Sequence, residues 1–496
     1  MKLPLLMKQT AMRAATIFFV KFIGLIGRVA LTRLVGAEGV GLYQIAYSFY
    51  GLTLILITGG LPTALALSTA KNAAQGWLFF RIISFIILLI GAAVSLFAFH
   101  FSPLIAHILG NPQLDFAIRC LSPALLIVPL LSLLRGYLQG LEWYNAIAIS
   151  ELTEQFVRVA ALVLLVIFFL PSGVARALGG GVLGTSAGAL LAFLVLIVLL
   201  LFSRSQQQQK AYEPSATGQA FSLLLKTSFA IAVTRLLIPA SDFIEALLVP
   251  KRLQAAGYSA LEAMQMYGVL TGMAMILVYM PTILTAAVSH TLTMKIAVDW
   301  QEGRTDNFYR RTSAALEIGW LWGLISGLFL YLYAGELSWF IFGTHEAKLP
   351  IQYLSPVPLI TGLREISISV LWAQNHKKLP FVSLASAILI SFVLLYFLLA
   401  IPGFGYTGAA ISLLLLELIA AVWNLRALKI IQAGYFRIRT LLLDIVIIVL
   451  IFVVVSVINA LFENVTQPGL IVLLPGLLIF LGCTIIHIKI RSAALL

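Results

Sequence analysis

Apolar runs recur along the whole chain, separated by short stretches of polar residues, glycine and proline. Each run is continuously apolar rather than alternating, and a run of about 20 residues is long enough to cross a bilayer as a helix. Because only helices and closed barrels satisfy their backbone in lipid, the pattern predicts an all-α polytopic membrane protein. We place about fourteen transmembrane helices at residues 14–35, 40–69, 79–101, 115–138, 145–170, 180–203, 219–247, 264–290, 312–334, 352–374, 380–401, 406–428, 440–461 and 468–488.

Short motifs recur in the two halves of the chain at an offset of roughly 220 to 235 residues, which indicates an internal repeat. Leu-Ser-Pro occurs at 121–123 and 354–356, and related glycine-rich runs occur at 184–189 and 405–410. Six helices per repeat is an even number, so both halves have the same orientation in the membrane. This predicts two pseudo-symmetric six-helix lobes with a substrate path between them and rocking of one lobe against the other.

The repeat and one polar stretch divide the chain into four predicted parts. These are an N-terminal six-helix lobe at 1–203, a cytoplasmic linker at 204–218, a C-terminal six-helix lobe at 219–433 and two additional C-terminal helices at 434–496. The linker is rich in glutamine, which is typical of a segment outside the membrane. The last two helices fall outside the repeat and suggest an added lipid-facing groove.

Composition agrees with lipid as the main solvent. The 496 residues are 61% hydrophobic and 10% charged, with a mean hydropathy of +1.04, whereas soluble domains contain about 25% charged residues. The net charge of +13 does not indicate nucleic acid, because basic residues of membrane proteins collect at cytoplasmic helix ends. With a cytoplasmic N-terminus, the outside loops hold only Arg176, Lys251, Arg252 and Lys348.

That bias predicts cytoplasmic termini at both ends and an even number of spans. Arg13 and Arg135 are counted with the basic residues of the inside ends.

The two cysteines, Cys120 and Cys483, lie in separate apolar runs, so we expect no disulfide and no metal site. No catalytic motif and no nucleotide-binding loop occur, so we expect neither an enzyme nor a cofactor.

Seven basic residues remain inside predicted helices, where a charge normally faces a cavity or a partner: Lys21, Arg28, Arg33, Arg119, Arg158, Arg235 and Arg364. Lys21 and Arg28 are seven residues apart, so they lie within about 20° on one helix face. No acidic residue precedes Glu38, so Lys21 and Arg28 have no ion-pair partner on their own helix. Arg33 is read as reaching the outer interface.

Arg235 occupies the corresponding position in the second half, and Asp242 and Glu245 follow it on the same helix. Two cationic helices of this kind are suited to an anion such as a diphosphate, because guanidinium groups donate hydrogen bonds in pairs. The alternative is that Arg235 only forms an ion pair with Asp242.

The remaining intramembrane charges have two interpretations. Glu151, Glu154 and Arg158 form a stripe in which Glu154 and Arg158 neutralise one another, or a carboxylate left over carries a proton or cation. His290 and His487 lie near helix ends and are read as interfacial. The remaining charged residues inside predicted helices are candidate cavity residues, namely Arg364, Glu365 and Glu417.

Three stretches resemble the stage V sporulation protein B group of polysaccharide transporters, namely 21–43, 59–68 and 235–273. This group belongs to a superfamily that also holds the lipid II flippases and the multidrug and toxin extrusion antiporters. The resemblance covers essentially the whole chain. It implies a flippase for an undecaprenyl-pyrophosphate-linked saccharide, with a cavity between two lobes and a groove for the lipid tail at the two extra helices.

The resemblance also implies roles for particular positions. Lys21, where an arginine is usual, and Arg28 fall on basic cavity positions, and Glu245 falls on an acidic position of the seventh helix. The sequence has Leu42 where the lipid II flippases have an acidic residue, which separates it from that subgroup. A sugar headgroup would be met by Tyr43, Gln44, Tyr47 and Ser48, unless these groups serve helix packing.

The leading hypothesis is therefore a lipid-linked saccharide flippase that binds diphosphate through Lys21, Arg28 and Arg235. Asp242, Glu245, Glu151 and Glu154 are the candidates for ion or proton coupling. A cation-coupled multidrug antiporter is the alternative, and a membrane glycosyltransferase or polymer ligase is a third. The expected partners are the lipid-linked substrate, membrane lipids and a coupling cation or proton, with the protein as a monomer.

Overall fold

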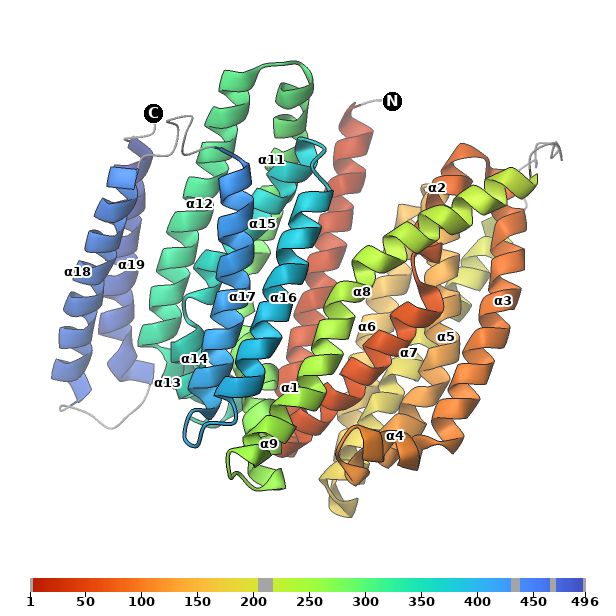
Figure 1. Ribbon diagram of the computed structural model, residues 1–496, viewed down its shortest axis with the longest axis horizontal. Helices are drawn as coiled ribbons and strands as arrows, with labels where there is room; N and C mark the ends of the chain where they lie inside the picture. The colour runs from red at the N-terminus through yellow and green to blue at the C-terminus, as the bar shows by residue number, and fades with distance from the viewer. Residues whose placement is uncertain (1–2, 204–216, 430–437, 464–469, 494–496) are drawn as a thin grey trace. The chain divides into compact units, whose positions relative to one another are not determined.

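The computed structural model describes residues 3–203, 217–429, 438–463 and 470–493, and every regular element in these ranges is a helix. The all-α membrane class is therefore confirmed. In chain order the elements are α1 (Leu3–Thr58), α2 (Leu61–Lys71), α3 (Ala73–His100), α4 (Ser102–Ile108), η1 (Pro112–Leu114), α5 (Asp115–Gly140), α6 (Tyr144–Phe169), η2 (Leu170–Ser172), α7 (Val174–Ser203), α8 (Thr217–Ala255), α9 (Ala260–Gly268), η4 (Val269–Ala274), α10 (Met275–Tyr279), α11 (Thr282–Gln301), α12 (Thr305–Leu332), α13 (Ala334–Phe342), α14 (Lys348–Leu354), α15 (Val357–Ala373), α16 (Lys378–Leu398), α17 (Gly405–Ala427), α18 (Ile438–Glu463) and α19 (Leu470–Ala493) (Figure 1).

Within the described residues, 11 helices are long and apolar enough to cross a membrane. The number rises to 12 if α14 and α15, which meet at a 42° bend, form one span. The predicted count of fourteen is therefore not confirmed. Two of the predicted helices are missing from this number. The first two predicted helices both lie in α1, which contains a kink and is counted once, and the last lies in α19, where only a shorter apolar helix is found at Gly476–His487.

The break between the first two predicted helices lies at Gly36. There α1 contains a residue with φ 67° and ψ −172°, a conformation that side chains with a Cβ rarely adopt, so glycine is needed at this point. The second predicted helix is interrupted again at Gly59, which has φ 51°, before α2 begins. Figure 1 shows α1 as two helical segments that meet at this turn.

Residues Met1–Lys251 and Ser259–Gly268 form one compact unit, here called unit 1. In it, α1 packs against α6 and α9, and α5 packs against α2, α3 and α7. The direction of packing follows from matched contacts: Gly136 and Gly140 of α5 approach Pro62 and Ala66 of α2 in ascending order, so these two helices run parallel. Helix α8 belongs to unit 1 up to Lys251.

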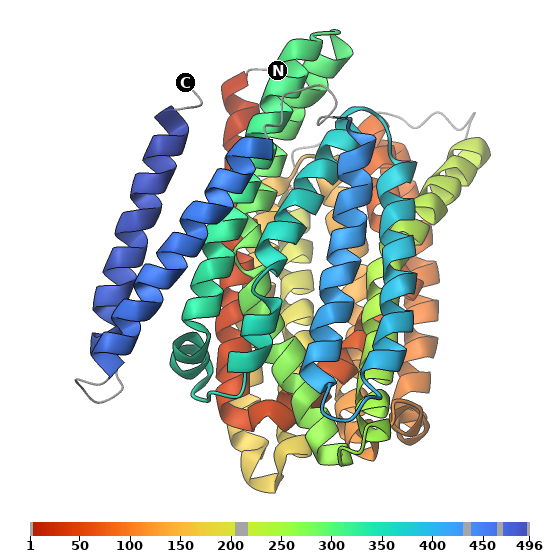
Figure 2. The ribbon, with the colours of Figure 1, turned by 60° about the vertical axis from the view of Figure 1, so that its left-hand side comes forward.

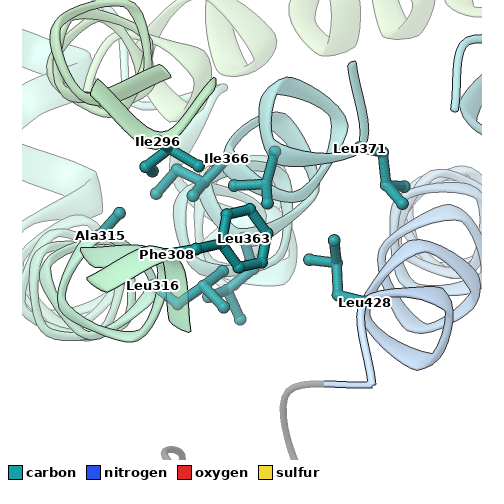
Figure 3. Packing of buried hydrophobic residues seen from close by; sticks show 9 residues of the cluster. Ile296, Phe308, Ala315, Leu316, Leu363, Ile366, Leu371 and Leu428 are labelled. Atoms are coloured by element: carbon teal, nitrogen blue, oxygen red, sulfur yellow. The ribbon is translucent and has the colours of Figure 1, made fainter. Parts of the chain in front are cut away.

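Residues Arg252–Tyr258 and Val269–Leu496 form unit 2. Its largest cluster of buried apolar side chains joins α11, α12, α15 and the end of α17 (Figure 3). The C-terminal helices α18 and α19 pack against one another, as Figure 2 shows, and a second apolar cluster ties them to α12. Helices α18 and α19 therefore pack on α12 of unit 2, as expected for two helices added to the repeat.

One interhelical hydrogen bond recurs in both units. The hydroxyl groups of Tyr47 in α1 and Thr185 in α7 are hydrogen bonded in unit 1, and Tyr279 of α10 donates to Glu417 of α17 at 3.1 Å in unit 2. In each case the two residues are 138 positions apart, and corresponding residues are separated by the offset of the sequence repeat. The repeat is therefore present in the packing as well as in the motifs.

The proposed lobe boundaries at 203, 219 and 433 stay a prediction. Most of the proposed linker, residues 204–216, lies outside the described residues, as do residues 430–437 before α18.

Candidate functional site

Arg28 is held between two parts of α1 that the turn at Gly36 brings together. In a straight helix, 16 residues would span about 24 Å, yet Arg28 Nη1 donates to Gln44 Oε1 at 2.8 Å across that separation. The guanidinium also lies 5.3 Å from the ring centroid of Tyr43. Both partners are uncharged, so Arg28 keeps its positive charge uncompensated by these contacts.

Lys21 and Arg28 lie on the helix face of α1 that packs on α6. A Cβ at Gly24, which lies between them on that stripe, would come within 2.8 Å of Gln155 Nε2 of α6, so the two helices approach closely at this point. Lys21 is exposed, and its side chain makes no hydrogen bond or ion pair with any described residue. The predicted basic stripe on α1 therefore exists, with one anchored member and one unanchored member.

Arg235 is exposed on α8, and among the described residues its side chain makes no ion pair. The alternative interpretation, an ion pair between Arg235 and Asp242, is therefore not found. Pro239 lies between them and has no N–H, so the carbonyl of Arg235 lacks its usual helical donor. Asp242 and Glu245 interact with one another electrostatically one turn apart, and neither has a basic partner in the described part of the chain.

The other two predicted coupling residues are ion paired. Glu151 accepts two hydrogen bonds from Arg13 at 2.5 and 2.9 Å. Glu154 is buried and accepts from Arg135 at 2.7 Å, and also from Arg158 on its own helix. The predicted self-neutralisation of Glu154 and Arg158 is thus present, but a second arginine shares the same carboxylate.

Arg13 and Arg135 form ion pairs that their predicted positions at the inside ends of helices did not indicate. Arg135 reaches Ser150 through Nη2 at 2.7 Å as well as Glu154. A signal for this contact exists: α5 and α6 form a hairpin with a tight connection near residue 141, so residues at similar distances from that turn face each other. No periodic pattern on one helix would reveal it.

Three tyrosines of α1 stack beside this ion-pair network. The rings of Tyr43 and Tyr47 lie 4.2 Å apart, and Tyr47 and Tyr50 lie 5.7 Å apart edge to face. The guanidinium of Arg158 interacts electrostatically with all three. Tyr47 is hydrogen bonded to Thr185 of α7, and Ser48 donates to its own helix at Ile45. A role of these two residues in sugar binding stays a prediction.

Tyr47→Phe is expected to lower stability by about 0.6 kcal/mol, the average value for a hydrogen bond between transmembrane helices. The ring packing is kept, and the bond between the Tyr47 and Thr185 hydroxyl groups is lost. A double-mutant cycle with Thr185→Val, measured by equilibrium unfolding in mixed detergent, would isolate that energy. A coupling energy of zero would mean that the bond makes no net contribution.

In unit 2 the structure brings together charges that look isolated in the sequence. Arg364 Nε donates to Glu417 Oε2 at 2.5 Å, and Tyr279 donates to the same carboxylate. Beside them, Thr285 Oγ1 donates to Glu365 Oε2 at 3.3 Å. Arg364 and Glu417 are largely buried, with 15% and 4% of their side chains exposed.

The prediction of an interfacial position is wrong for His487. It is buried, and its Nε2 lies 3.2 Å from Oδ1 of the buried Asp444. The pair joins α19 to α18. The pair depends on how α18 and α19 pack against one another, which no pattern along one helix predicts. His290 has no described side chain.

Comparison with known proteins agrees with the predicted resemblance. The chain is 28% identical over 418 residues to stage V sporulation protein B of Bacillus subtilis (strain 168), which covers 82% of this chain and 80% of that protein. It is 24% identical over 417 residues to the lipid II flippase MurJ of the same organism, covering 78% of this chain and 76% of that one. The resemblance to the stage V sporulation protein B group is therefore confirmed.

Two solved structures share the fold. A lipid II flippase MurJ in an inward closed conformation aligns with a TM-score of 0.74 at 17% identity, over 97% of this chain and 99% of that one. An inward-facing multidrug resistance transporter of the MATE family aligns with a TM-score of 0.65 at 12% identity, over 84% and 95%. The family description "Polysaccharide biosynthesis protein" matches residues 6–293, and the chain belongs to this family of polysaccharide biosynthesis proteins.

Proposed function

We propose that the protein is a flippase that moves an undecaprenyl-pyrophosphate-linked saccharide from the cytoplasmic to the outer leaflet by alternating access. The substrate is a peptidoglycan precursor such as lipid II or a related cell-wall or polysaccharide precursor. The observation that carries the proposal is the presence of Lys21, Arg28 and Arg235 in membrane-spanning helices of unit 1 without carboxylate partners among the described residues.

A charge in a membrane-spanning segment costs at least a few kcal/mol unless it meets a partner or water. Each ion-paired arginine of unit 1 contacts a carboxylate. Arg28 is not ion paired, and its guanidinium contacts an amide oxygen and an aromatic ring. One bond to Gln44 leaves most of the five guanidinium N–H groups available. A diphosphate would supply the missing negative charge and accept these hydrogen bonds in pairs.

The lipid tail needs an apolar surface that begins near a polar one. Unit 2 contains a groove of about 660 Å³ on α17 that is almost wholly apolar except for one arginine near its end. Its lining residues are Leu418, Ile419, Val422, Trp423, Arg426 and Ala427. The groove supports binding of a prenyl chain or another membrane lipid.

The proposal includes a place and an orientation. The relatives are bacterial proteins, and the loop charges favour cytoplasmic termini in the cell membrane. The carboxylates proposed for coupling to a cation or proton are first Asp242 and Glu245, because Glu151 and Glu154 are matched by arginines. We propose a monomer, since one chain already contains both repeats.

The test is translocation of an undecaprenyl-diphosphate-linked disaccharide by the purified full-length protein in liposomes. Arg235→Ala is expected to slow translocation at least tenfold, because one cationic contact with phosphate is lost. Lys226→Ala is the matched control, since Lys226 is an exposed cation on the same helix. Failure of the wild type to move this lipid under any ion gradient would refute the flippase assignment.

A cation-coupled multidrug antiporter is the second candidate. It is favoured by Asp242 and Glu245, which have no basic partner in the described residues, and by the fold shared with the MATE transporter. Efflux of a cationic dye driven by a proton or Na⁺ gradient in the same liposomes would support this candidate. Loss of that efflux in Glu245→Gln, with unchanged lipid translocation, would assign antiport as the function of these carboxylates.

A further inference from the structure

Two short helices, α4 in unit 1 and α13 in unit 2, occupy corresponding places in the two repeats. Each follows a membrane-spanning helix, α3 or α12, after a single residue. That residue is Phe101 in unit 1, with φ −98° and ψ 18°, and Tyr333 in unit 2, with φ −108° and ψ 22°. The two breaks have nearly the same backbone conformation and are separated by the offset of the sequence repeat.

Neither short helix can cross a membrane. They contain 7 and 9 residues, so they are about 11 and 14 Å long, against about 30 Å for the hydrocarbon core. Figure 2 shows α4 and α13 almost end-on while α3 and α12 run up the page, so each short helix lies across the helix that precedes it. Each is followed by a glycine with a left-handed backbone, Gly110 at φ 84° and Gly343 at φ 78°.

Helix α4 has one buried face and one exposed apolar face. Ile105 and Ala106 are buried, and the helix packs on α5. Leu104 and Ile108, one turn apart and therefore on one face, are 53% and 56% exposed. Leaving two large aliphatic side chains in water costs free energy in proportion to their exposed area, so this face is suited to an apolar environment.

Helix α13 repeats this division with other residues. Ser338 and Phe342 are buried, whereas Trp339 and Phe340 are 57% and 61% exposed. The Trp339 ring stacks on the exposed His345, with 5.2 Å between centroids and 12° between planes. Tryptophan is enriched where membranes meet water, because one part of its ring system is apolar and its N–H is polar.

The exposed face of α4 continues a surface that faces lipid. Helix α3 is long enough to span the bilayer, and only 22% of its most apolar stretch is buried inside the protein. In its last turn Phe97 is exposed, and its ring lies 4.8 Å from that of the exposed Phe101 at the start of α4. In unit 2 the exposed Tyr331 lies in the last turn of α12, just before α13. Lipid is therefore the partner that already covers the adjoining surface.

Each short helix also lies beside the aliphatic stem of an exposed lysine. A Cβ at Gly110, directly after α4, would lie 3.5 Å from Lys251 Cε, and a Cβ at Gly335 of α13 would lie 3.4 Å from Lys348 Cδ. These are two of the four basic residues that the predicted topology assigns to outside loops. A lysine stem on an apolar surface places its ammonium group at the level of the lipid headgroups, where phosphate is the complementary charge.

We propose that α4 and α13 are interfacial anchors that lie in the phospholipid headgroup layer at the membrane surface where α3 and α12 end. Their exposed apolar side chains insert toward the acyl chains, and Lys251 and Lys348 meet lipid phosphates. In the proposed orientation this surface belongs to the outer leaflet. Each unit then has its own fixed depth at that leaflet. The anchoring is independent of the flippase assignment.

The experiment measures the depth of a nitroxide label on the full-length protein in liposomes of phosphatidylethanolamine and phosphatidylglycerol. The native cysteines are removed by Cys120→Ala and Cys483→Ala, and the label is attached to Ile108→Cys on α4 or Phe340→Cys on α13. Depth follows from the ratio of collisions with O₂, which concentrates among acyl chains, to collisions with a water-soluble Ni²⁺ chelate. Both labels are expected about 5 to 10 Å below the headgroup surface.

Two labelled positions are the references. Phe85→Cys, at an exposed site in the middle of α3, reports the acyl core, and Gln301→Cys, at the exposed polar end of α11, reports water. The proposal is overturned if the anchor labels are as accessible to Ni²⁺ as the label at 301, or as deep as the label at 85. Dipolar broadening between labels of two copies also overturns it, because a second chain would then cover the helix. If Ile108→Cys does not fold, Leu104→Cys on the same face takes its place.

Discussion

Arg28→Ala is expected to reduce translocation of the lipid-linked saccharide at least a hundredfold while leaving the amount of folded protein unchanged. A hundredfold loss corresponds to about 2.7 kcal/mol, within the range for removing one partner of a charge-assisted phosphate contact. The fold tolerates the change because Gln44 and the Tyr43 ring, which contact the Arg28 guanidinium, are uncharged, so neither becomes an unpaired charge. The measurement is the initial rate in liposomes with matched protein content.

Two further variants make this result specific. Arg176→Ala removes an exposed basic residue from the same unit and is expected to have no effect. Arg28→Lys keeps the charge but not the paired donors, so a partial rate, between those of the wild type and Arg28→Ala, is expected. Wild-type rates for Arg28→Ala would show that the cationic stripe of α1 does not contact the diphosphate.

Glu154→Gln has the largest expected effect on stability. The carboxylate is shared by Arg135 and Arg158, so its loss leaves two largely buried guanidinium groups in unit 1 without a counter-charge. Breaking a buried pair in this way costs about 3 to 5 kcal/mol. We expect a fall in melting temperature of about 5 to 10 °C, measured in detergent at a fixed scan rate.

Glu142→Gln is the control, because Glu142 is an exposed carboxylate of the same unit. The double variant Glu154→Gln with Arg158→Gln removes one positive charge as well, and it is expected to recover part of the lost stability. A wild-type melting temperature for Glu154→Gln would mean that water or lipid phosphate already compensates both arginines. In that case the network would not hold α5 to α6.

The positions of the intramembrane charges were predictable, and most of their partners were not. Lys21 and Arg28 lie on one face of α1 because helical periodicity alone decides which residues share a stripe. That Arg28 meets Gln44 depends on the turn at Gly36, which reverses the direction of the chain. The pairing of Arg364 with Glu417, 53 residues away, depends on which helices of unit 2 become neighbours.

Partners on neighbouring helices also explain why His487 is not interfacial and why Arg135 is ion paired. Each was assigned from its place near a helix end, where lysine, arginine and histidine usually meet the interface. In the structure, His487 contacts Asp444 of α18, and Arg135 contacts Glu154 of α6. Each side chain therefore points toward a neighbouring helix rather than toward the interface. Side chains of this length reach several ångströms beyond their helix end, so end position alone does not determine their surroundings.

The sequence by itself determined that this protein is an all-helical membrane protein with an internal repeat, because burying apolar runs in lipid leaves the backbone few other solutions. It also placed Lys21, Arg28 and Arg235 inside apolar runs. Only the tertiary structure decided which of them are neutralised, since ion pairs between helices depend on packing that brings distant residues within about 3 Å. That distinction leaves Lys21, Arg28 and Arg235 without carboxylate partners in the described residues, and it pairs Arg364 with Glu417.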